Sequence, residues 1–594
     1  MLLSGNEAIA LGFRDAGGHF AAAYPGTPST EILETIATFQ EVYAQWSPNE
    51  KAAFESVFGA SLAGARVLVA MKHVGLNVAA DPLFTSVYTG VNGGMVVVSA
   101  DDPSMHSSQN EQDNRNYAPF AKLPLLEPSD PQECYDFVGM ALEISERYDI
   151  PVLLRVETRL SHGKARVETS GERADVPMRE PDLRWEKYVM MPANARPRRV
   201  DLARRLSELL EFSEGGGLNR IEPGDKKIGI ISSGISYMYA REVFPDASYL
   251  KLGMSYPFPE KLVRAFAEDI LNAGGVIYIV EELDPFVEMR VRAMGIPCKG
   301  KDTLPEIGEL SPEIIRSAIK GERFNTKPLS GAPSRPPNLC PGCPHTSVFF
   351  QLNRLKANVF GDIGCYTLGA LPPLSAIKTC ICMGASVTNA FGFAKARGGE
   401  EAKKTVAVIG DSTFFHMGVP GTMEMVYNNG VNTVIVLDNR TTAMTGHQVH
   451  PGSGKTLKGE ETVALLPEKI AEALGIDHIK VIDPYDLKLV RKTLKDAMDH
   501  DGPSFVVARR ACVLLPGERK RWEALPKYVV LEEKCAGEKC FLCLRLGCPA
   551  IFTVDGKARI DRTLCTSCSL CAQVCPKTYN AIFPEDQLAE VKNA

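Results

Sequence analysis

The sequence predicts a multidomain α/β protein with doubly wound parallel sheets and a small α+β domain near its C-terminal end. Its 594 residues are too many for a single hydrophobic core. Apolar runs of strand length, such as 94–99 and 151–156, alternate with helical stretches, a pattern typical of strands buried on both faces of a parallel sheet. Eight of the sixteen cysteines lie between Cys535 and Cys575, which sets this short segment apart from the rest.

Two changes in composition and the start of the cysteine-rich tail separate the expected domains. The charged, proline-containing segment Pro177–Arg198 is interpreted as a linker, and the Pro- and Ser-rich stretch Lys327–Asn338 marks a second boundary. The four domains are expected at residues 1–185, 199–325, 335–525 and 530–594.

Composition excludes several classes of protein. A net charge of −6 without a basic tract argues against nucleic-acid binding. The apolar runs, such as 276–280, are far shorter than the ~20 residues that span a bilayer, and the N-terminus lacks the features of a signal peptide. We therefore expect a cytoplasmic protein whose clustered cysteines bind metal or do redox work. The isolated Cys134 and Cys298 are expected to be buried thiols.

Two apolar strands of the third expected domain end in polar residues. Strand 405–410 is followed by Asp411, and strand 433–437 leads to Asn439. Because ligands bind beyond the carboxyl ends of parallel strands, both side chains should face one crevice. A carboxylate, an amide oxygen and a backbone carbonyl suit Mg²⁺, which keeps diphosphate oxygens and water as its other ligands. Gly410 would let the backbone approach the diphosphate closely. The alternative is a pair of ordinary strands that end in polar turns.

The cysteines near the C-terminal end form two runs. The second run, Cys565-x2-Cys568-x2-Cys571-x3-Cys575-Pro576, has the spacing of a bacterial ferredoxin cluster site, and Cys535-x4-Cys540-x2-Cys543-x4-Cys548-Pro549 is a looser version. A pair of zinc sites is the alternative, but zinc ribbons need neither the third closely spaced cysteine nor the Cys-Pro ending. In ferredoxin-like domains the last cysteine of each run serves the other cluster. Two [4Fe-4S] clusters are therefore expected, one on Cys535, Cys540, Cys543 and Cys575, the other on Cys565, Cys568, Cys571 and Cys548.

The strand ends also resemble the Gly-Asp-Gly…Asn motif of thiamine-diphosphate enzymes, with Ser412 in place of the second glycine. The resemblance implies that Asp411 and Asn439 are the side-chain ligands of Mg²⁺ and that Thr441 donates its carbonyl oxygen. In these enzymes a glutamate of a separate pyrimidine-binding domain bonds the N1′ nitrogen of the cofactor and so tunes its basicity.

The segment 47–55 resembles the one that carries this glutamate, with Glu50 as the first choice and Glu55 as the second. The alternative is that Glu50 only favours the dipole of the helix that it opens.

Thiamine motifs followed by a two-cluster tail resemble the 2-oxo-acid:ferredoxin oxidoreductase family, over essentially the whole chain. The family order is a pyrimidine-binding domain, a transketolase-C-terminal-like domain, a diphosphate-binding domain and a ferredoxin-like domain, which matches the four expected here. Besides the tail, the resemblance is carried by Tyr24-Pro-Gly-Thr-Pro-Ser-Thr-Glu31, Ser107-Ser-Gln-Asn-Glu-Gln-Asp-Asn-Arg115, Val280-Glu-Glu-Leu-Asp-Pro285 and Cys340-Pro-Gly-Cys-Pro-His345.

The resemblance implies ferredoxin-dependent oxidative decarboxylation of an aryl 2-oxo acid, of the indolepyruvate or phenylpyruvate type, to an aryl-acetyl-CoA and CO₂. Thiamine diphosphate, Mg²⁺ and iron–sulfur clusters would be the cofactors, and coenzyme A the co-substrate. The aryl preference rests on the resemblance alone, so pyruvate, 2-oxoglutarate and branched-chain 2-oxo acids stay open. A non-oxidative thiamine-diphosphate decarboxylase or carboligase also stays open, as does an electron-transfer subunit without catalysis.

Further residues follow from the same resemblance. Arg115 is expected to bind the substrate carboxylate, which a guanidinium fork suits, and Thr27 to lie beside the substrate. Cys380 and Cys382 are expected to be buried structural thiols. Four other cysteines either hold a third cluster close to the thiamine cofactor or are structural thiols as well: Cys340, Cys343, Cys365 and Cys512.

One expected part of the family is missing from this sequence. Related enzymes have a Gly-rich domain with a Gly-x-Gly-Gly-Gln-Gly-like turn, and no such stretch occurs here. In the enzymes that act on aryl substrates, this domain is a separate small beta subunit. The resemblance therefore implies a partner subunit in an α₂β₂ assembly, with ferredoxin as the electron acceptor.

Overall fold

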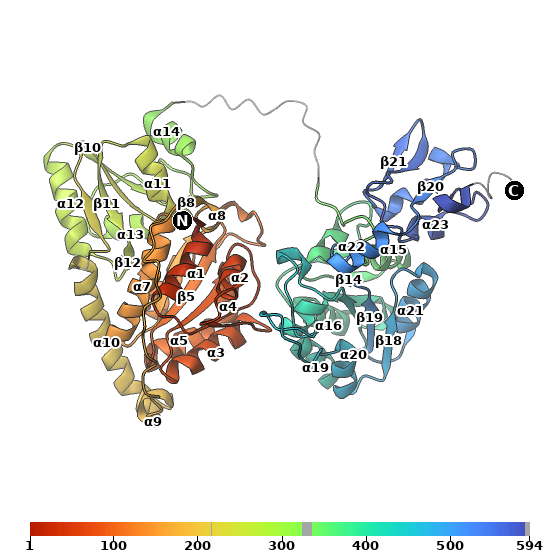
Figure 1. Ribbon diagram of the computed structural model, residues 1–594, viewed down its shortest axis with the longest axis horizontal. Helices are drawn as coiled ribbons and strands as arrows, with labels where there is room; N and C mark the ends of the chain where they lie inside the picture. Colours follow the sequence, from red (N-terminus) through yellow and green to blue (C-terminus); the bar gives the residue numbers. More distant parts are fainter. Residues whose placement is uncertain (216, 323–335, 589–594) are drawn as a thin grey trace. The chain divides into compact units, whose positions relative to one another are not determined.

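The computed structural model describes residues 1–215, 217–322 and 336–588, which form two compact units, Met1–Ser330 and Gly331–Ala594 (Figure 1). Each unit is described by itself. Most of the expected boundary Lys327–Asn338 lies outside the described residues, since only its last three residues are described. Both units contain parallel sheets covered by helices, so the predicted α/β class is confirmed.

The first unit is built on a seven-stranded sheet. Six of its strands are parallel, and the seventh, β12, runs antiparallel to β6 at one edge. The central strands are buried along their whole length, as expected for a sheet covered on both faces. In spatial order the strands are β12 (Met254–Tyr256), β6 (Leu125–Leu126), β7 (Val152–Glu157), β5 (Met95–Asp101), β4 (Val67–Lys72), β2 (Phe20–Ala23) and β3 (Tyr43–Trp46).

Helices pair with one another around this sheet. Helix α1 (Gly5–Asp15) packs on α7 (Pro131–Tyr148), and α3 (Glu50–Leu62) packs on α5 (Ala80–Thr89). Helix α1 begins where its sequence predicts, because Ser4 and Glu7 form a reciprocal capping box. The short helix α4 (His73–Val78) starts directly after β4, which keeps the end of that strand close to α3.

A second, smaller sheet belongs to the same unit. Its strands β10 (Asp225–Ser233), β11 (Ala247–Leu252) and β13 (Val276–Val280) are parallel, and β9 (Arg220–Glu222) is antiparallel at the edge. The two expected domains of this unit share a strand, because β12 follows β11 in the sequence but pairs with β6 of the larger sheet.

The expected linker Pro177–Arg198 is wrong in its last part. Helix α10 (Pro192–Gly215) begins within it, with Pro192 at its first position, where a missing N–H costs nothing.

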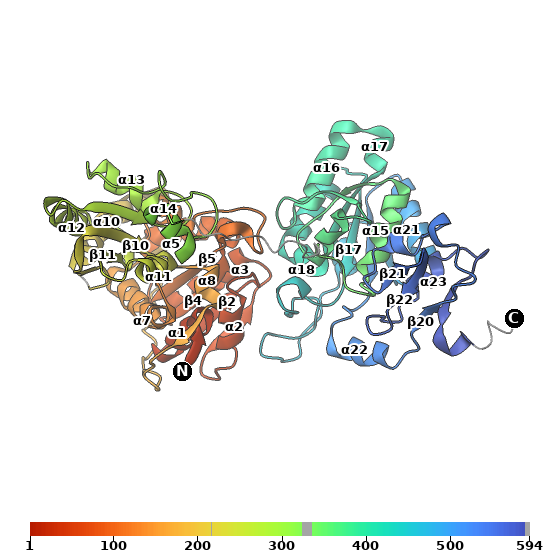
Figure 2. The ribbon, with the colours of Figure 1, turned by 90° about the horizontal axis from the view of Figure 1, so that it is seen from above.

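The second unit contains a six-stranded sheet whose strands are all parallel. Alternate residues of β16 enter different hydrophobic cores. Val406 and Val408 face the helices α15 (His345–Leu355) and α21 (Leu487–Asp499), and Ala407 and Ile409 face α16 (Ala385–Arg397) and α19 (Val419–Tyr427). Helices α15, α16 and α21 are labelled in Figure 2. In spatial order the strands are β15 (Ile377–Thr379), β14 (Asn358–Phe360), β16 (Thr405–Gly410), β17 (Thr433–Asp438), β19 (Ser504–Arg509) and β18 (His478–Ile482).

The cysteine-rich segment packs on the face of this sheet that carries α15 and α21. It contains two small antiparallel pairs, β20 (Tyr528–Val530) with β23 (Ile582–Pro584) and β21 (Ile551–Val554) with β22 (Lys557–Ile560), and one short helix, α23 (Leu570–Val574). Its apolar side chains belong to the same core as Val406 and Leu494, so the segment is an integral part of the second unit.

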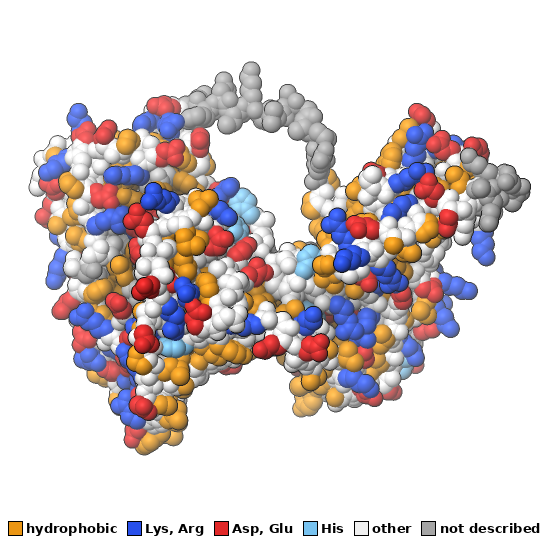
Figure 3. Space-filling view, in the orientation of Figure 1, with side chains coloured by type: hydrophobic (Ala, Val, Ile, Leu, Met, Phe, Trp, Pro, Cys, Tyr) orange, Lys and Arg blue, Asp and Glu red, His pale blue; other side chains and the backbone are white. Residues whose placement is uncertain are grey.

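Side chains of both charges are interspersed over the face shown in Figure 3, which agrees with the mild net charge. In the described parts of the chain, no helix has the length and apolarity needed to cross a bilayer.

Candidate functional site

Polar residues follow the neighbouring parallel strands β16 and β17, and we refer to this place as the β16–β17 edge. Asp411 is buried there, with 3% of its surface exposed. Its carboxylate accepts the backbone N–H groups of Ser412 and Arg440, both at 2.8 Å, and lies 3.1 Å from Nε2 of His450. Burial alone would raise the pKa of Asp411, but His450 and these N–H groups hold it below its ordinary value. The carboxylate is therefore ionised, as a metal ligand must be.

Asn439 and Thr441 lie on the same edge and are also buried. The backbone N–H of Thr441 donates to Oδ1 of Asn439 at 3.2 Å, which fixes the amide, while Nδ2 of Asn439 lies 3.5 Å from Nε2 of His345. Burial lowers the pKa of His345 to about 4, so its ring is neutral near pH 7 and adds no positive charge beside a metal ion. Donors of the kind that Mg²⁺ prefers thus follow two neighbouring strands at this edge.

Gly410 and Ser412 have roles in packing. A Cβ atom on Gly410 would lie 2.6 Å from the ring of Tyr366, so glycine is required there for the ring to pack against the strand end. Ser412 accepts a hydrogen bond from Oγ1 of Thr442 at 2.9 Å. That bond ties the start of the long segment between β17 and α20 (Pro467–Ala473) to the residues that follow β16.

The structure brings together Cys340, Cys343, Cys365 and Cys512. Burial and, to a smaller extent, the neighbouring thiols of Cys512 and Cys340 raise the pKa of Cys365 to about 11. The pKa of Cys343 is raised well above its ordinary value, mainly by burial and in part by the other three thiols of the group. The group adjoins the β16–β17 edge, because the backbone N–H of Cys512 donates to the carbonyl of Asn439 at 3.0 Å.

The other cysteines outside the tail differ from one another. Cys134 is fully buried, as expected, whereas Cys298 is only half-buried. Cys380 is half-buried, with its sulfur 3.5 Å from the carbonyl oxygen of Asp362. The expectation of a buried thiol is wrong for Cys382, which is exposed because it lies in a turn outside the sheet.

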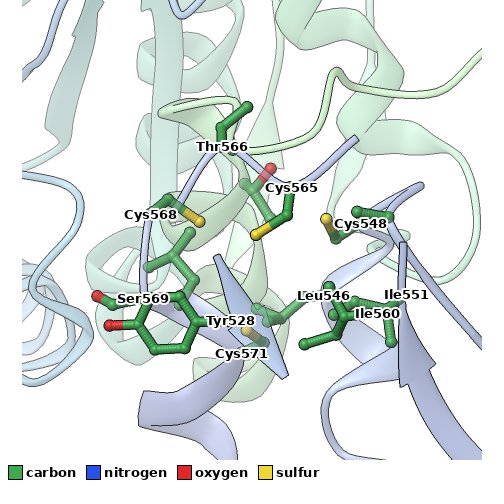
Figure 4. Close-up of a pocket in the computed structure, with 14 residues that line it drawn as sticks. Tyr528, Leu546, Cys548, Ile551, Ile560, Cys565, Thr566, Cys568, Ser569 and Cys571 are labelled. Carbon is green, nitrogen blue, oxygen red and sulfur yellow. The ribbon is translucent and has the colours of Figure 1, made fainter. Parts of the chain in front are cut away.

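Two cavities of the tail are each lined by four cysteines. One is otherwise mainly apolar, and Figure 4 shows its cysteines around the space together with Tyr528 and Leu546. The first is lined by Cys548, Cys565, Cys568 and Cys571, and the second by Cys535, Cys540, Cys543 and Cys575. These are the two sets into which ferredoxin spacing divides the eight cysteines.

Among the described residues, the tail thiols line their two cavities and no three of them meet at one point. Backbone N–H groups also reach the sulfurs, for example Gly537 to Cys535 at 3.4 Å and Ala581 to Cys575 at 3.3 Å, and such bonds influence the reduction potential of a cluster.

The first tail cavity adjoins the Cys340–Cys343 turn. Gly342, between those two cysteines, lines the cavity together with Cys548. The hydroxyl of Tyr485 donates to the carbonyl oxygen of Gly342. The cysteine group at the β16–β17 edge and the tail are therefore linked by a single turn of the backbone.

In the first unit, Glu50 opens helix α3 near the carboxyl ends of β3 and β4. Asn49 caps the helix by accepting the N–H of Ala52 at 2.8 Å, and Glu50 is buried, with 5% of its surface exposed. Its carboxylate lies against Gly75 of α4, where an added Cβ would come within 2.7 Å of Oε1. Glu55, the second choice, is exposed and pairs with Lys51, so the geometry favours Glu50.

Thr27 lies at the carboxyl end of the adjacent strand β2, in a turn in which Ser29 donates to the carbonyl of Gly26 at 2.9 Å. Lys72, the last residue of β4, extends along this turn, because a Cβ on Gly26 would lie 3.4 Å from Cδ of Lys72. We refer to Thr27, Glu50 and Lys72 as the β2–β4 edge.

Arg115 does not face an open site. Its side chain has 1% exposure and binds Asp113 through two nitrogens, with its shortest contact at 2.6 Å, and Glu281 at 2.6 Å. Its Nη2 also donates to the carbonyl oxygens of Glu282 and Asp284. The guanidinium thus joins the two sheets of the first unit, and this arrangement favours a structural role over substrate binding.

Two protein-family models match the chain. Residues 12–205 match the family described as "Pyruvate flavodoxin/ferredoxin oxidoreductase, thiamine diP-bdg". Residues 362–508 match the one described as "Thiamine pyrophosphate enzyme, C-terminal TPP binding domain". The first match contains the β2–β4 edge, and the second contains the β16–β17 edge.

Relatives that align over nearly the whole chain show to which family it belongs. The chain is 40% identical to the indolepyruvate oxidoreductase subunit IorA of Archaeoglobus fulgidus, over 97% of this chain and 96% of the relative. It is 42% identical to the protein of the same name from Pyrococcus horikoshii, over the same shares of the two chains. This chain belongs to the IorA family. The 2-oxoglutarate synthase subunit KorA of Methanothermobacter thermautotrophicus is a more distant relative, 26% identical over 54% of this chain and 98% of its own length.

As an IorA-family chain, the protein is a thiamine-diphosphate-dependent subunit of a 2-oxo-acid:ferredoxin oxidoreductase, which confirms the expected reaction class. A carboligase and an inactive electron-transfer subunit are thereby set aside.

Sequence reasoning missed His345, His450 and Lys72 in this IorA-family chain. The only sequence signal for His345 was its place directly after the Cys340–Cys343 motif. His450 and Lys72 are positioned by chain folding, and no local pattern marks them.

Proposed function

We propose that this chain oxidatively decarboxylates aryl 2-oxo acids of the indolepyruvate type to aryl-acetyl-CoA and CO₂ and passes the electrons to ferredoxin. The observation that carries the redox part is the contact between Cys512 and Asn439, because it sets a four-cysteine group directly beside the β16–β17 edge. The aryl preference is supported by the names of the relatives at about 40% identity.

Asp411, Asn439 and the carbonyl of Thr441 would hold Mg²⁺ and, through it, the diphosphate of thiamine diphosphate. Bound thiamine diphosphate would supply the carbon nucleophile that this reaction needs. The buried, ionised carboxylate of Asp411 supports this assignment, since it lies beside an amide oxygen fixed by the backbone of Thr441. Glu50 would bind the pyrimidine N1′ nitrogen, because it is the buried carboxylate at the β2–β4 edge.

Two [4Fe-4S] clusters in a ferredoxin-like domain at 530–594 would occupy the two tail cavities, with one four-cysteine set each. A third cluster would be held by Cys340, Cys343, Cys365 and Cys512. Such clusters carry single electrons, and the turn at Gly342 gives a short path between the third site and the tail.

The relatives are named as subunits, which supports a partner for this chain. We propose that a small beta subunit supplies the Gly-rich domain and that the complex is α₂β₂. The expected domains at 1–185, 199–325 and 335–525 would then be the pyrimidine-binding, transketolase-C-terminal-like and diphosphate-binding parts.

The test is anaerobic reduction of ferredoxin or a viologen by the purified complex with coenzyme A. Indolepyruvate, phenylpyruvate, pyruvate and 2-oxoglutarate are compared, with and without added thiamine diphosphate. We expect fast, thiamine-dependent reduction with the two aryl acids only. Reduction with pyruvate or 2-oxoglutarate instead would discard the aryl preference, and no reduction with any acid would refute the proposed reaction.

A further inference from the structure

Lys72 is a cation at the β2–β4 edge whose charge no acidic side chain neutralises directly. Its ammonium donates to the carbonyl oxygen of Ser107 at 2.8 Å. Among the described residues, no carboxylate lies within 4 Å of it, and that carbonyl is its one hydrogen-bond acceptor. An ammonium has three donors, so Lys72 keeps two for a ligand.

Asp102, which attracts the ammonium of Lys72, is hydrogen-bonded by other groups. Its carboxylate accepts the N–H of Ser107 at 2.8 Å and the hydroxyls of Ser108 at 2.6 Å and Thr158 at 2.7 Å. Asp102 and Glu50 attract the ammonium only from a distance. The carboxylate of Asp102 therefore has hydrogen-bond donors from the protein, whereas the ammonium of Lys72 has a single acceptor.

Two other cations of this sheet edge, Arg115 and Arg155, are paired with buried carboxylates. The contacts of Arg115 with Asp113 and Glu281 use most of its donors. Arg155 is equally buried and binds Asp101 at 2.7 Å and Glu157 at 2.6 Å. These guanidiniums stabilise buried carboxylates, and withdrawing either for a ligand would leave those carboxylates unpaired at a large cost.

His73, the neighbour of Lys72, is also unsuited to hold an anion. It is fully buried, its Nε2 lies 3.0 Å from Oδ1 of Asn110, and burial lowers the pKa of its ring. The imidazole is therefore neutral near pH 7.

We propose that Lys72 binds the carboxylate of the 2-oxo acid substrate. The inference rests on the proposed function and gives Lys72 the role that sequence resemblance gives to Arg115. The stem of Lys72 runs along Gly26, next to Thr27, the residue expected beside the substrate. A carboxylate on the two spare donors would replace the water that this half-buried ammonium loses, and such charge-assisted bonds are among the strongest in proteins.

The titration of Lys72 gives the site a recognisable pH dependence. Burial lowers its pKa to about 8, and the attraction of Asp102 and Glu50 opposes this shift in part. The ammonium is present below pH 8 and is lost as the pH rises through 8, while the substrate carboxylate stays ionised throughout. Binding of the carboxylate should therefore weaken above pH 8.

The test compares 3-phenyllactate, an aryl 2-hydroxy acid that cannot be decarboxylated by this chemistry, with its methyl ester. Both are titrated by calorimetry into the full complex, as wild type and as Lys72→Met, Lys72→Arg and, as a control, Lys164→Met. Lys164 is an exposed lysine of β8 (Lys164–Arg166) in the same unit.

We expect wild type and Lys164→Met to prefer the acid to the ester. Lys72→Met should lose roughly 10- to 100-fold in affinity for the acid and little for the ester. Lys72→Arg should keep part of the preference and extend it above pH 8.

An acid-to-ester ratio in Lys72→Met equal to that of wild type would overturn the inference, as would a wild type without preference. A parallel loss of both affinities would show that Lys72 only supports the loop at Ser107, which also refutes the inference. Failure of the proposed function is distinguishable, because a wild-type complex that prefers the acid but reduces no viologen keeps the Lys72 assignment and loses the reaction.

Discussion

The two sheet edges of this chain are built on opposite principles. At the β16–β17 edge, Asp411 and Asn439 directly follow their strands, and backbone N–H groups of nearby residues fix both side chains. At the β2–β4 edge, Glu50 lies on the first turn of a helix, and Lys72 ends a strand with one backbone acceptor. At the β16–β17 edge, the protein itself holds the polar atoms in place before a ligand binds. At the β2–β4 edge, the ammonium of Lys72 keeps donors for a ligand.

This difference matches two tasks in one reaction. A metal–diphosphate group needs fixed ligands, and preorganised donors avoid the cost of reordering when it binds. A substrate needs groups that change partners when it enters and leaves. Changes at the β16–β17 edge should therefore affect cofactor binding, and changes at the β2–β4 edge should affect turnover with the cofactor bound.

The largest effect on cofactor binding is expected for Asp411→Asn. Loss of the charged ligand should weaken thiamine diphosphate binding at fixed Mg²⁺ by at least about 100-fold, because even supporting residues of metal sites are worth 10- to 100-fold. Calorimetric titration of the complex with the cofactor measures this. Asp483→Asn is the matched control, since this exposed aspartate follows β18 of the same sheet and should bind the cofactor normally. Unchanged affinity in Asp411→Asn would remove Asp411 from the metal site.

Glu50→Gln should impair turnover without impairing cofactor binding. Cofactor binding and iron content should stay near wild type, while decarboxylation should fall by roughly 10²- to 10⁴-fold, the usual contribution of acid–base catalysis. Viologen reduction together with a cofactor titration on the same sample checks this. Glu55→Gln, on the exposed side of the same helix, should retain activity. A fully active Glu50→Gln variant would transfer the role elsewhere.

The sequence predicts the β16–β17 edge better than the β2–β4 edge. The reason is how far apart in the sequence the contacting residues lie. Asp411, Asn439 and the tail cysteines follow local rules, the end of a strand or a fixed spacing between thiols. Arg115 shows the limit of such rules, because its partner Glu281 is 166 residues away in the chain. The sequence alone does not show that Glu281 is a partner, so an arginine in a polar segment is easily interpreted as a substrate-binding residue.

Long-range pairing also explains the other differences. No local pattern indicates that Lys72 lacks an acidic partner, that His450 approaches Asp411, or that β12 leaves its own sheet for a neighbouring one. Each of these depends on which segments the fold brings together.

The smallest expected effect tests how tightly the β2–β4 edge holds its carboxylate. In Gly75→Ala, the new Cβ would lie 2.7 Å from Oε1 of Glu50, closer than carbon and oxygen tolerate, so the carboxylate must shift by a fraction of an ångström. A misplacement of this size should lower the turnover number about tenfold without weakening cofactor binding, because small errors in position cost rate before they cost affinity.

Gly59→Ala is the matched control for this change. Gly59 lies in helix α3 with open space around its Cβ position, so alanine there should leave turnover unchanged and stabilise the helix slightly. Equal turnover in Gly75→Ala and Gly59→Ala would mean that Glu50 can move without cost. The carboxylate of Glu50 would then be adaptable. Both charged groups of the β2–β4 edge, Glu50 and Lys72, would in that case differ from the fixed groups of the β16–β17 edge.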